Sequence, residues 1–448
     1  MNTPMNGEAV SKIIKESKLK NVGLASIREL NRLVNNIEKA TGEKFIRMEM
    51  GIPGLDAPKV AIDAEIEALK RGVSSKYPPF EGVPEVKSEI QKFVKNFMNV
   101  DVNFEGCLPT VGSMQGCYMG QMVCTRRFKN KNKILFIDPG FPVNKRQAAV
   151  IGIQSASFDI YDFRGDKLRD KLDSILSSGE FGALLYSNPN NPAWITLTEE
   201  ELSIIGEMCT KHDVVALEDL AYFGMDFRLD YSKPGVEPFI PTVAKYTDNY
   251  ILIISSSKSF TLAGQRIGMT VISNNLFEKE YKDLESWFGS TSFGHAYLFG
   301  ALYALSSGVS HSAQYGLAGV LKAVNDGTFN FVDSVREYGE RAKVMKDLFK
   351  KYGFHIVYDT DGNEPIADGF YFTVAYNGFD GGELIEELLY YGISAIALTT
   401  TGSTRHEGLR ACVSLTGSDR YEDLEERLKC FAKDHENNER AKDFFRNV

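Results

Sequence analysis

Five short apolar runs, interrupted by segments with helical spacing, constrain the fold of this chain more than any other feature. They are residues 134–137, 183–186, 214–217, 250–254 and 267–272. Strands that are apolar along their whole length are typical of sheets covered on both faces, because neither face reaches water. Thr198, followed by Glu201 three residues later, predicts that one intervening helix begins with a capping box. We therefore predict an α/β fold with a mostly parallel sheet between two layers of helices.

The last third of the chain has a different pattern. A long helix is expected to end near Tyr352-Gly353, where the glycine suits a left-handed cap. Short strands are expected over 370–375 and 409–415, with a helix over 383–391 between them. A chain of 448 residues is long enough for one large and one smaller domain. We predict an N-terminal segment with part of the small domain at 1–70, a large domain at 71–344 and a small α+β domain at 345–448.

The composition excludes several classes of protein. A formal net charge of −9 argues against a nucleic-acid partner, which requires a basic surface. No apolar run approaches the roughly 20 residues that span a membrane, and the polar segment from Met1 to Lys20 lacks the apolar core of a signal peptide. The six cysteines have no spacing typical of a metal site, so we expect reduced thiols and no metal. These observations predict a cytoplasmic protein.

Unusual polar residues follow three of the predicted strands. Asn191 comes shortly after the run at 183–186, Asp219 and Tyr222 follow the run at 214–217, and Lys258 follows the run at 250–254. Open parallel sheets bind ligands beyond the carboxyl ends of their strands, so these side chains are expected to meet in one crevice. Each also has an ordinary alternative. Asn191 suits a turn, Asp219 a helix N-cap and Lys258 a solvated surface charge.

The chemistry of a phosphorylated cofactor explains these residues together. A phosphate binds backbone N–H groups at a helix start, which Gly112–Gln115 would supply. Ser255 and Arg266 would add a hydroxyl and a guanidinium, although Arg266 alone could equally pair with a surface acid. An imine requires an amine such as that of Lys258, and a protonated pyridine requires a carboxylate such as that of Asp219.

Six motifs in order resemble the class I and II aminotransferases of the pyridoxal-phosphate-dependent fold type I, whose type member is aspartate aminotransferase. The resemblance covers Met50 to Leu415, and its strongest stretch is SSSKSFTLAGQRIG at 255–268. The other motifs are YPPFEGVPEVK at 77–87, VGSMQG at 111–116, DPGFP at 138–142, SNPNNP at 187–192 and LEDLAYFGMDF at 217–227. The resemblance implies a large domain with a mostly parallel sheet, a smaller α+β domain and an enzyme that moves an amino group between an amino acid and a 2-oxo acid.

The resemblance also implies a role for individual residues. Lys258 would hold pyridoxal 5'-phosphate as a Schiff base and shuttle the substrate proton, and Asp219 would pair with the pyridine nitrogen. Asn191 and Tyr222 would bind the ring's phenolic oxygen, and Phe141 would stack on the ring. The phosphate would be held by Ser113, Met114, Gln115, Ser255 and Arg266, and Tyr77 would reach it from a second subunit. Arg410 would bind the substrate α-carboxylate, together with Asn191. The expected assembly is therefore a homodimer with shared active sites.

Some residues depart from the family pattern, and other functions stay open. Ala193 and Trp194 follow the Asn-Pro pair where the family usually has threonine and glycine, and Phe141 lacks the polar edge of the usual tryptophan or tyrosine. No arginine lies between Arg266 and Arg336, so we do not expect a dedicated aspartate enzyme that uses an arginine there. A carbon–sulfur β-lyase or a decarboxylase would have the same cofactor motifs. A pyridoxal-phosphate-sensing regulator would require a DNA-binding module ahead of Met50, and a catalytically dead scaffold would not require Lys258, Asp219, Arg266 and Arg410 together.

Overall fold

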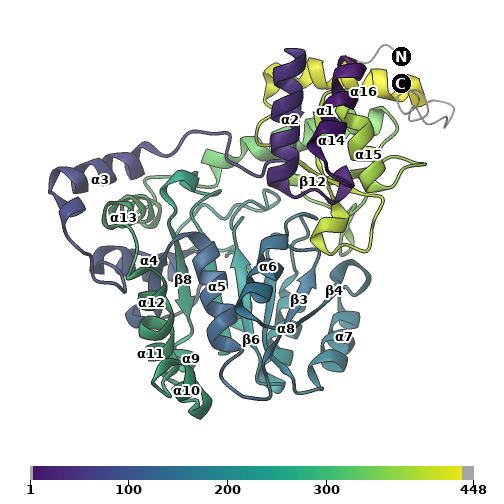
Figure 1. Ribbon diagram of the computed structural model, residues 1–448. Coiled ribbons are helices and arrows are strands. Elements are labelled where there is room, and N and C mark those ends of the chain that lie inside the picture. The colour runs from purple at the N-terminus through teal and green to yellow at the C-terminus, as the bar shows by residue number, and fades with distance from the viewer. Residues whose placement is uncertain (1–3, 436–448) are drawn as a thin grey trace. The chain divides into compact units, whose positions relative to one another are not determined.

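A computed structural model describes residues 4–435 of the chain (Figure 1). It divides the chain into two compact units. Unit 1 contains the described parts of Met1–Gly54 and Arg336–Val448 together with Asn191–Trp194. Unit 2 contains Leu55–Asn190 and Ile195–Val335. The sequence predicted domain boundaries after residues 70 and 344. Residues 1–3 and 436–448 of the predicted first and last segments lie outside the described residues.

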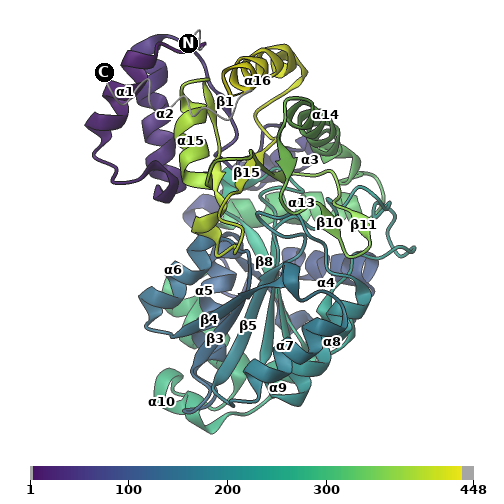
Figure 2. The same cartoon turned by 90° about the vertical axis from the view of Figure 1, so that its right-hand side faces the viewer.

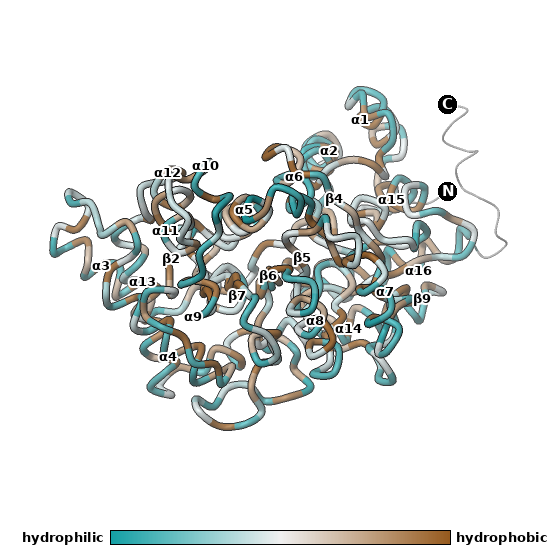
Figure 3. The backbone as a smooth tube through the Cα atoms, turned by 90° about the horizontal axis from the view of Figure 1, so that it is seen from below, coloured by the Kyte–Doolittle hydropathy of each residue, from teal (hydrophilic) through white to brown (hydrophobic). Residues whose placement is uncertain are grey.

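Unit 2 is built around a sheet of seven strands. In spatial order they are β2 (Cys107–Thr110), β8 (Gly268–Ile272), β7 (Tyr250–Ser255), β6 (Val215–Leu220), β5 (Phe181–Ser187), β3 (Lys133–Asp138) and β4 (Ser155–Asp159). β8 runs antiparallel to its two neighbours β2 and β7, and the other strand pairs of this sheet are parallel, which confirms the mostly parallel sheet. Every residue of β5, β6 and β7 is buried, as their apolar runs predict, and Figure 3 shows hydrophobic stretches at these central strands.

The five predicted strands are present, and two others escaped the sequence analysis. β2 contains Pro109 and β4 begins with three exposed residues, so neither has the continuous apolar run that marks the central strands. β2 lies at one edge of the sheet and β4 at the other. An edge strand has one open side and so is less constrained in composition, which explains why the apolar pattern missed both.

Helices cover both faces of this sheet. Figure 2 shows α5 and α6 on one side and α7 and α8 on the other. The helices of unit 2 are α3 (Lys59–Lys70), α4 (Pro84–Met98), α5 (Gly112–Cys124), α6 (Pro142–Ile151), α7 (Asp166–Leu176), α8 (Glu199–Lys211), α9 (Asn274–Glu278), α10 (Glu285–Phe288), α11 (Phe293–His295), α12 (Ala304–Ser306) and α13 (His311–Asn325), with a π-helix at Ala296–Tyr303. The predicted capping box is confirmed, because Thr198 and Glu201 bind each other's backbone N–H groups.

Unit 1 combines helices with a small antiparallel sheet. Its strand order is β14 (Ile396–Ala397), β15 (Leu409–Cys412), β12 (Tyr371–Ala375) and β9 (His355–Ile356). Two further pairs are β1 (Ile46–Arg47) with β13 (Ile393–Ser394) and β10 (Thr360–Asp361) with β11 (Glu364–Pro365). The helices are α1 (Gly7–Ser17), α2 (Ile27–Thr41), α14 (Glu337–Lys351), α15 (Gly381–Leu389) and α16 (Tyr421–His435). Gly353 follows α14 with a φ of 88°, which confirms the left-handed residue predicted there.

No helix within 4–435 is both long and apolar enough to cross a membrane. In the same range, no cluster of three or more histidine, cysteine, aspartate or glutamate side chains could hold a metal ion.

Candidate active site

The first turn of α5 and the side chain of Arg266 form a close pair in unit 2. Gly112 begins α5 with a φ of 64°. A Cβ built on this glycine would lie 2.8 Å from Nη2 of Arg266, so the guanidinium occupies the space that any other residue's side chain would need. Within the described chain, the N-cap residue Val111 makes no side-chain hydrogen bond to the N–H groups of this first turn. Backbone N–H groups at a helix start and a guanidinium together suit a phosphate.

The loop between β7 and β8 brings Ser255 and Arg266 to this helix start. Because these two strands are antiparallel neighbours, the loop leaves and re-enters the sheet at one edge, and Ser255 lies opposite Gly268. A Cβ on Gly268 would lie 3.0 Å from the backbone nitrogen of Ser113, so the strand and the helix start are in close contact. Ser255, Arg266 and Ser113, which the sequence analysis assigned to one phosphate, are therefore close together.

The two remaining residues of the predicted phosphate turn are held by neighbouring groups. The Gln115 side chain accepts a hydrogen bond from the Val111 N–H (2.8 Å) and donates one to Oγ of Ser306 (2.7 Å). The Met114 carbonyl accepts a hydrogen bond from Nε2 of Gln147 (2.9 Å). Since these bonds use the Gln115 side chain and the Met114 carbonyl, a phosphate would meet these residues through their backbone N–H groups.

Lys258 lies in a turn that its neighbouring serines fix. Oγ of Ser256 donates a hydrogen bond to the Ile267 carbonyl, and Oγ of Ser259 donates one to the Phe223 carbonyl (2.7 Å). Both serines are buried, while Lys258 is partly exposed. The ordinary alternative for Lys258 was a solvated lysine on the surface. Its partial burial and the hydrogen bonds of the serines around it, which restrain its backbone, do not fit that alternative.

Asp219 is a buried carboxylate with an unused oxygen. It lies in β6, and its Oδ1 has no hydrogen-bond partner among residues 4–435. Burial raises the pKa of Asp219 to about 7, and a hydrogen bond from the Asn144 side chain offsets part of this rise. An unpartnered buried carboxylate oxygen is costly unless a ligand supplies a donor or a positive charge. A protonated pyridine nitrogen would supply both.

Helix α6 connects the predicted ring-stacking residue to this carboxylate. Phe141 is the N-cap of α6, and Asn144 is three residues further along. The loop before α6 is fixed because Nδ2 of Asn190 donates a hydrogen bond to the Pro139 carbonyl (2.7 Å). Tyr222, also predicted for the cofactor, is buried in the turn that follows β6. Phe141, Tyr222 and Asp219 thus belong to the same unit as Lys258 and the phosphate groups.

Arg410 and Asn191 are together in unit 1. Arg410 is only 2% exposed, and its Nη1 lies 3.4 Å from Oδ1 of Asn191 while its Nη2 donates a hydrogen bond of 2.5 Å to the Glu49 carbonyl. The Glu49 carboxylate pairs with Arg47 instead, at 2.7 Å. Nε of Arg410 has no hydrogen-bond partner in the described part of the chain. A buried guanidinium without a carboxylate partner suits a ligand that brings its own carboxylate.

Tyr77 is the most exposed of the predicted site residues. Its side chain is 93% exposed, and it lines a cavity of about 660 Å³ in unit 2 together with Val73, Pro78, Ser307 and His311. An aromatic side chain this exposed makes no use of its apolar surface within the described chain. This cavity also includes Ser306, which accepts the Gln115 hydrogen bond, but within the described chain no hydrogen bond joins Tyr77 itself to the other predicted phosphate residues.

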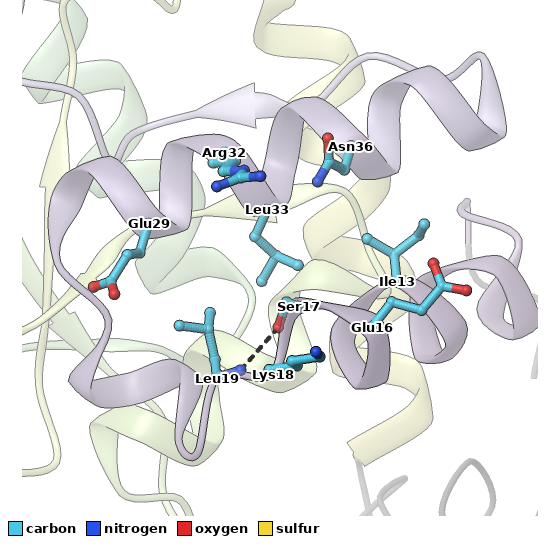
Figure 4. Close-up of a pocket in the computed structure, with 9 residues that line it drawn as sticks. All are labelled: Ile13, Glu16, Ser17, Lys18, Leu19, Glu29, Arg32, Leu33 and Asn36. Atoms are coloured by element: carbon cyan, nitrogen blue, oxygen red, sulfur yellow. Dashed lines mark hydrogen bonds between the residues drawn. The ribbon is translucent and has the colours of Figure 1, made fainter.

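A second hollow, of about 510 Å³, is lined by residues between 13 and 36 of unit 1. Figure 4 shows these residues on α1, on α2 and on the segment that connects them. Its lining includes Lys18, Glu29, Arg32 and Asn36, and none of the predicted site residues is among the described residues that line it. Its charges are mixed and exposed, so it gives no indication of a ligand.

The sequence analysis missed three residues that contact the predicted ones. Asn144 binds Asp219, and its position three residues after Phe141 on a helix was a usable signal. The ring of Tyr371 lies 4.6 Å from Cζ of Arg410, a contact that depends on how β12 pairs with β15 and has no local signature. Glu49 contributes only its carbonyl, which any residue could supply.

Comparisons with known proteins identify the family of the chain. A family model described as aminotransferase class I and II matches residues 43–420. A probable aspartate aminotransferase of Methanocaldococcus jannaschii is 24% identical over 416 residues, covering 92% of this chain and 97% of the relative. An LL-diaminopimelate aminotransferase of Natranaerobius thermophilus is 24% identical over 343 residues, covering 76% of this chain and 80% of the relative. These names favour amino transfer over the lyase and decarboxylase alternatives.

Solved structures show the same fold. An aspartate aminotransferase double mutant of Thermus thermophilus superimposes with a TM-score of 0.72 at 17% identity, covering 94% of this chain and 98% of that one. An aminotransferase of Mycobacterium tuberculosis also gives a TM-score of 0.72, at 16% identity, covering 91% and 96%. The fold that these structures share with the chain is the one predicted from the resemblance.

Proposed function

The chain belongs to the class I and II aminotransferases and is an enzyme of that family, and from this premise we propose which of its residues carry out the transfer. Members of this family depend on pyridoxal phosphate. The observation that best supports the same cofactor here is Asp219. Its buried Oδ1 has no partner within residues 4–435, and burial raises its pKa to about 7. A cationic ring nitrogen beside it would hold this carboxylate in its ionised form.

The predicted cofactor residues would bind the cofactor by its two ends. The N–H groups of Ser113, Met114 and Gln115, the hydroxyl of Ser255 and the guanidinium of Arg266 would hold the phosphate. Gly112 supports this assignment, because any side chain there would displace the Arg266 guanidinium. At the other end, Asp219 would hold the ring nitrogen and Phe141 would cover the ring face, while Tyr222 and Asn191 would bind the phenolic oxygen.

Lys258 would carry the chemistry of the chain itself. When bound, pyridoxal phosphate supplies an aldehyde and a ring that accepts electrons from the substrate Cα. The Lys258 amine would hold the cofactor between turnovers, leave it when a substrate amine arrives, and then remove the Cα proton as a general base. The hydrogen bonds of Ser256 and Ser259 would keep this amine in position, because they fix the turn on both sides of it.

Arg410 would orient the substrate. Its two-pronged guanidinium suits the α-carboxylate that every amino acid and 2-oxo acid carries. Holding that carboxylate would restrict the orientation of the substrate, which is the contribution that positioning makes to catalysis. The side-chain preference is a separate matter. The missing arginine between Arg266 and Arg336 leads us to expect no strong preference for aspartate over neutral or aromatic donors.

A donor panel with a lysine variant tests this proposal. The purified enzyme is incubated with each L-amino acid and 2-oxoglutarate, and the 2-oxo acid products are identified by mass spectrometry. We expect the matching 2-oxo acids and glutamate from the wild type. Lys258→Ala should lose both this activity and the visible absorbance of lysine-bound cofactor, while Lys282→Ala, an exposed lysine of unit 2, should keep both. Pyruvate with ammonia, or a decarboxylated amine, in place of the 2-oxo acid would contradict amino transfer. An active Lys258→Ala enzyme with unchanged absorbance would contradict the role of the lysine.

A further inference from the structure

Four residues that begin with the Asn191-Pro192 pair belong to unit 1, although the chain on either side of them belongs to unit 2. Asn191–Trp194 is grouped with unit 1, and the flanking residues Asn190 and Ile195 are joined in unit 2 by a hydrogen bond of 2.8 Å from N–H to carbonyl. Trp194, at the end of this segment, is 0% exposed. A short excursion of the chain thus buries one of its two tryptophans within the unit that contains Arg410.

The backbone of Trp194 has a conformation that side chains disfavour. Its φ is 65°, in the left-handed region that glycine adopts readily and that costs other residues free energy. The family usually has glycine at this position. The backbone of Trp194 therefore keeps a conformation that suits the family's glycine, although the residue is a tryptophan. Strain of this kind persists where surrounding contacts over-determine the conformation, and it occurs most often at functional sites.

The indole of Trp194 packs directly against two residues near β12. A Cβ built on Gly369 would lie 2.0–2.2 Å from three atoms of the indole, so the ring fills the space that a side chain at 369 would occupy. Its ring centroid lies 6.2 Å from that of Tyr371, with the planes at 68°. An edge-to-face pair of this kind is favourable and directional, so Trp194 restrains the tilt of the Tyr371 ring.

Tyr371 is the residue on which the Arg410 guanidinium rests. Cζ of Arg410 lies 4.6 Å from the centroid of the Tyr371 ring. The two residues are diagonal neighbours across β12 and β15, since Tyr371 pairs with Cys412 and Thr373 pairs with Arg410. The far end of the ring lies close to Gly51, because a Cβ on that glycine would lie 2.0 Å from the Tyr371 hydroxyl oxygen.

We propose that Trp194 is a positioning residue for the substrate carboxylate, acting on Arg410 through the ring of Tyr371. The segment that supplies Asn191 to one side of Arg410 also supplies Trp194, whose indole holds the surface beneath the guanidinium. Nη2 of Arg410 is held by the Glu49 carbonyl, but Nε has no partner in the described residues. A small tilt of the Tyr371 ring would therefore change the orientation of the guanidinium plane. This inference rests on the proposed function, specifically on Arg410 as the α-carboxylate site.

The test compares ligands with and without an α-carboxylate. The holoenzyme is titrated with the best L-amino acid of the donor panel and with the amine that has the same side chain but no carboxylate, and the cofactor absorbance reports binding. Trp194→Gly should weaken amino-acid binding about 10- to 100-fold, the scale expected for a misplaced binding group, and should leave amine binding within about twofold. Trp194→Phe keeps an aromatic edge and should restore most of the difference.

A second variant and a cycle with Arg410 separate positioning from folding. Trp194→Leu keeps a buried apolar side chain, so it should fold and show the same selective loss even if Trp194→Gly is too unstable to purify. In an Arg410→Ala background, Trp194→Leu should add little, because two residues that act through one contact are not additive. The matched control is Trp287→Leu, a 62% exposed tryptophan on α10, which should behave as the wild type.

Two failures have different meanings. Equal losses for the amino acid and the amine in Trp194→Leu, or no loss in either, would overturn the inference while leaving Arg410 in its role. Unchanged amino-acid binding in Arg410→Ala would overturn the proposed function itself.

Discussion

Two adjacent carboxyl groups of β6, Glu218 and Asp219, are both buried, and their partners give them different tasks. Successive side chains of a strand point to opposite faces of the sheet, so the two groups are separated by the strand itself. Oε2 of Glu218 accepts hydrogen bonds from the Thr242 hydroxyl (2.6 Å) and the Val243 N–H (3.1 Å), which ties a distant loop to the sheet. Oδ1 of Asp219 and Oε1 of Glu218 both lack a hydrogen-bond partner among residues 4–435. Glu218 thus anchors the loop at Thr242 and Val243, while Asp219 is the carboxyl group that we propose for the cofactor.

Glu218→Gln should make the protein more stable at alkaline pH and change little at acid pH. Burial raises the pKa of Glu218 from 4.5 to about 7, so between these values the folded protein retains a proton that the unfolded chain has lost. The stability contributed by this group is complete below pH 4.5 and is lost as the pH rises to about 7. Glutamine does not ionise, and we expect a gain of about 1–3 kcal/mol in the free energy of unfolding at pH 8.

Urea unfolding of Glu218→Gln and wild type at pH 5 and pH 8 measures this difference. Glu200→Gln removes an exposed carboxyl of α8 and serves as the control that should change little at either pH. A gain of the same size at both pH values would show that the effect comes from packing and not from the titration of Glu218.

At the scale of elements, both the start of α5 and the proposed phosphate site depend on Gly112. Gly112→Ala would place a methyl group 2.8 Å from Nη2 of Arg266 in a backbone conformation with φ of 64°. We expect the affinity for pyridoxal phosphate to fall at least about tenfold, because losing one charge-assisted contact costs on the order of 1.5–3 kcal/mol. Equilibrium dialysis of the apoenzyme against the cofactor would measure the change.

Gly152→Ala is the matched control for this prediction. Gly152 ends α6 with a φ of 78°, and a Cβ there would meet nothing within 4 Å. Both variants strain a left-handed backbone, but only one of them pushes against Arg266. If both lower cofactor affinity equally, backbone strain and not the guanidinium is the cause.

The elements themselves show how far the sequence could be interpreted. The central strands were predictable because burial on both faces leaves a continuous apolar run, and the strand ends then indicated Asp219 and Lys258. The surroundings of Arg410 were not predictable in the same way. The Tyr371 contact exists only through the register of β12 and β15, and the place of Trp194 depends on a glycine at 369 that is remote in sequence. Contacts of that kind depend on tertiary packing, which a local pattern does not encode.

At the scale of the whole molecule, unit 2 exposes a group of aromatic and aliphatic side chains near Tyr77. Phe299, Tyr303 and Leu305 are 47%, 53% and 46% exposed, and the Phe80 ring lies 4.9 Å from Phe299 and 5.3 Å from Tyr303. A single chain rarely leaves such a group in water unless another protein covers it. This surface supports the proposed homodimer, in which Tyr77 would reach the phosphate of the second subunit and each site would contain residues of both chains.

Mixing two inactive variants tests whether the sites are shared. Tyr77→Ala and Lys258→Ala homodimers each carry a defect in both sites. If Tyr77 acts across the interface, each mixed dimer contains one site with both defects and one with neither. After complete exchange of an equal mixture, half of the dimers would be mixed, so the activity should recover to about one quarter of the wild-type value. The control is Lys258→Ala mixed with itself under two different tags, which should exchange subunits and stay inactive. If the tags demonstrate exchange and the Tyr77→Ala mixture gains no activity, Tyr77 acts within its own subunit. In that case one site of each mixed dimer lacks Tyr77 and the other lacks Lys258, so neither site is complete.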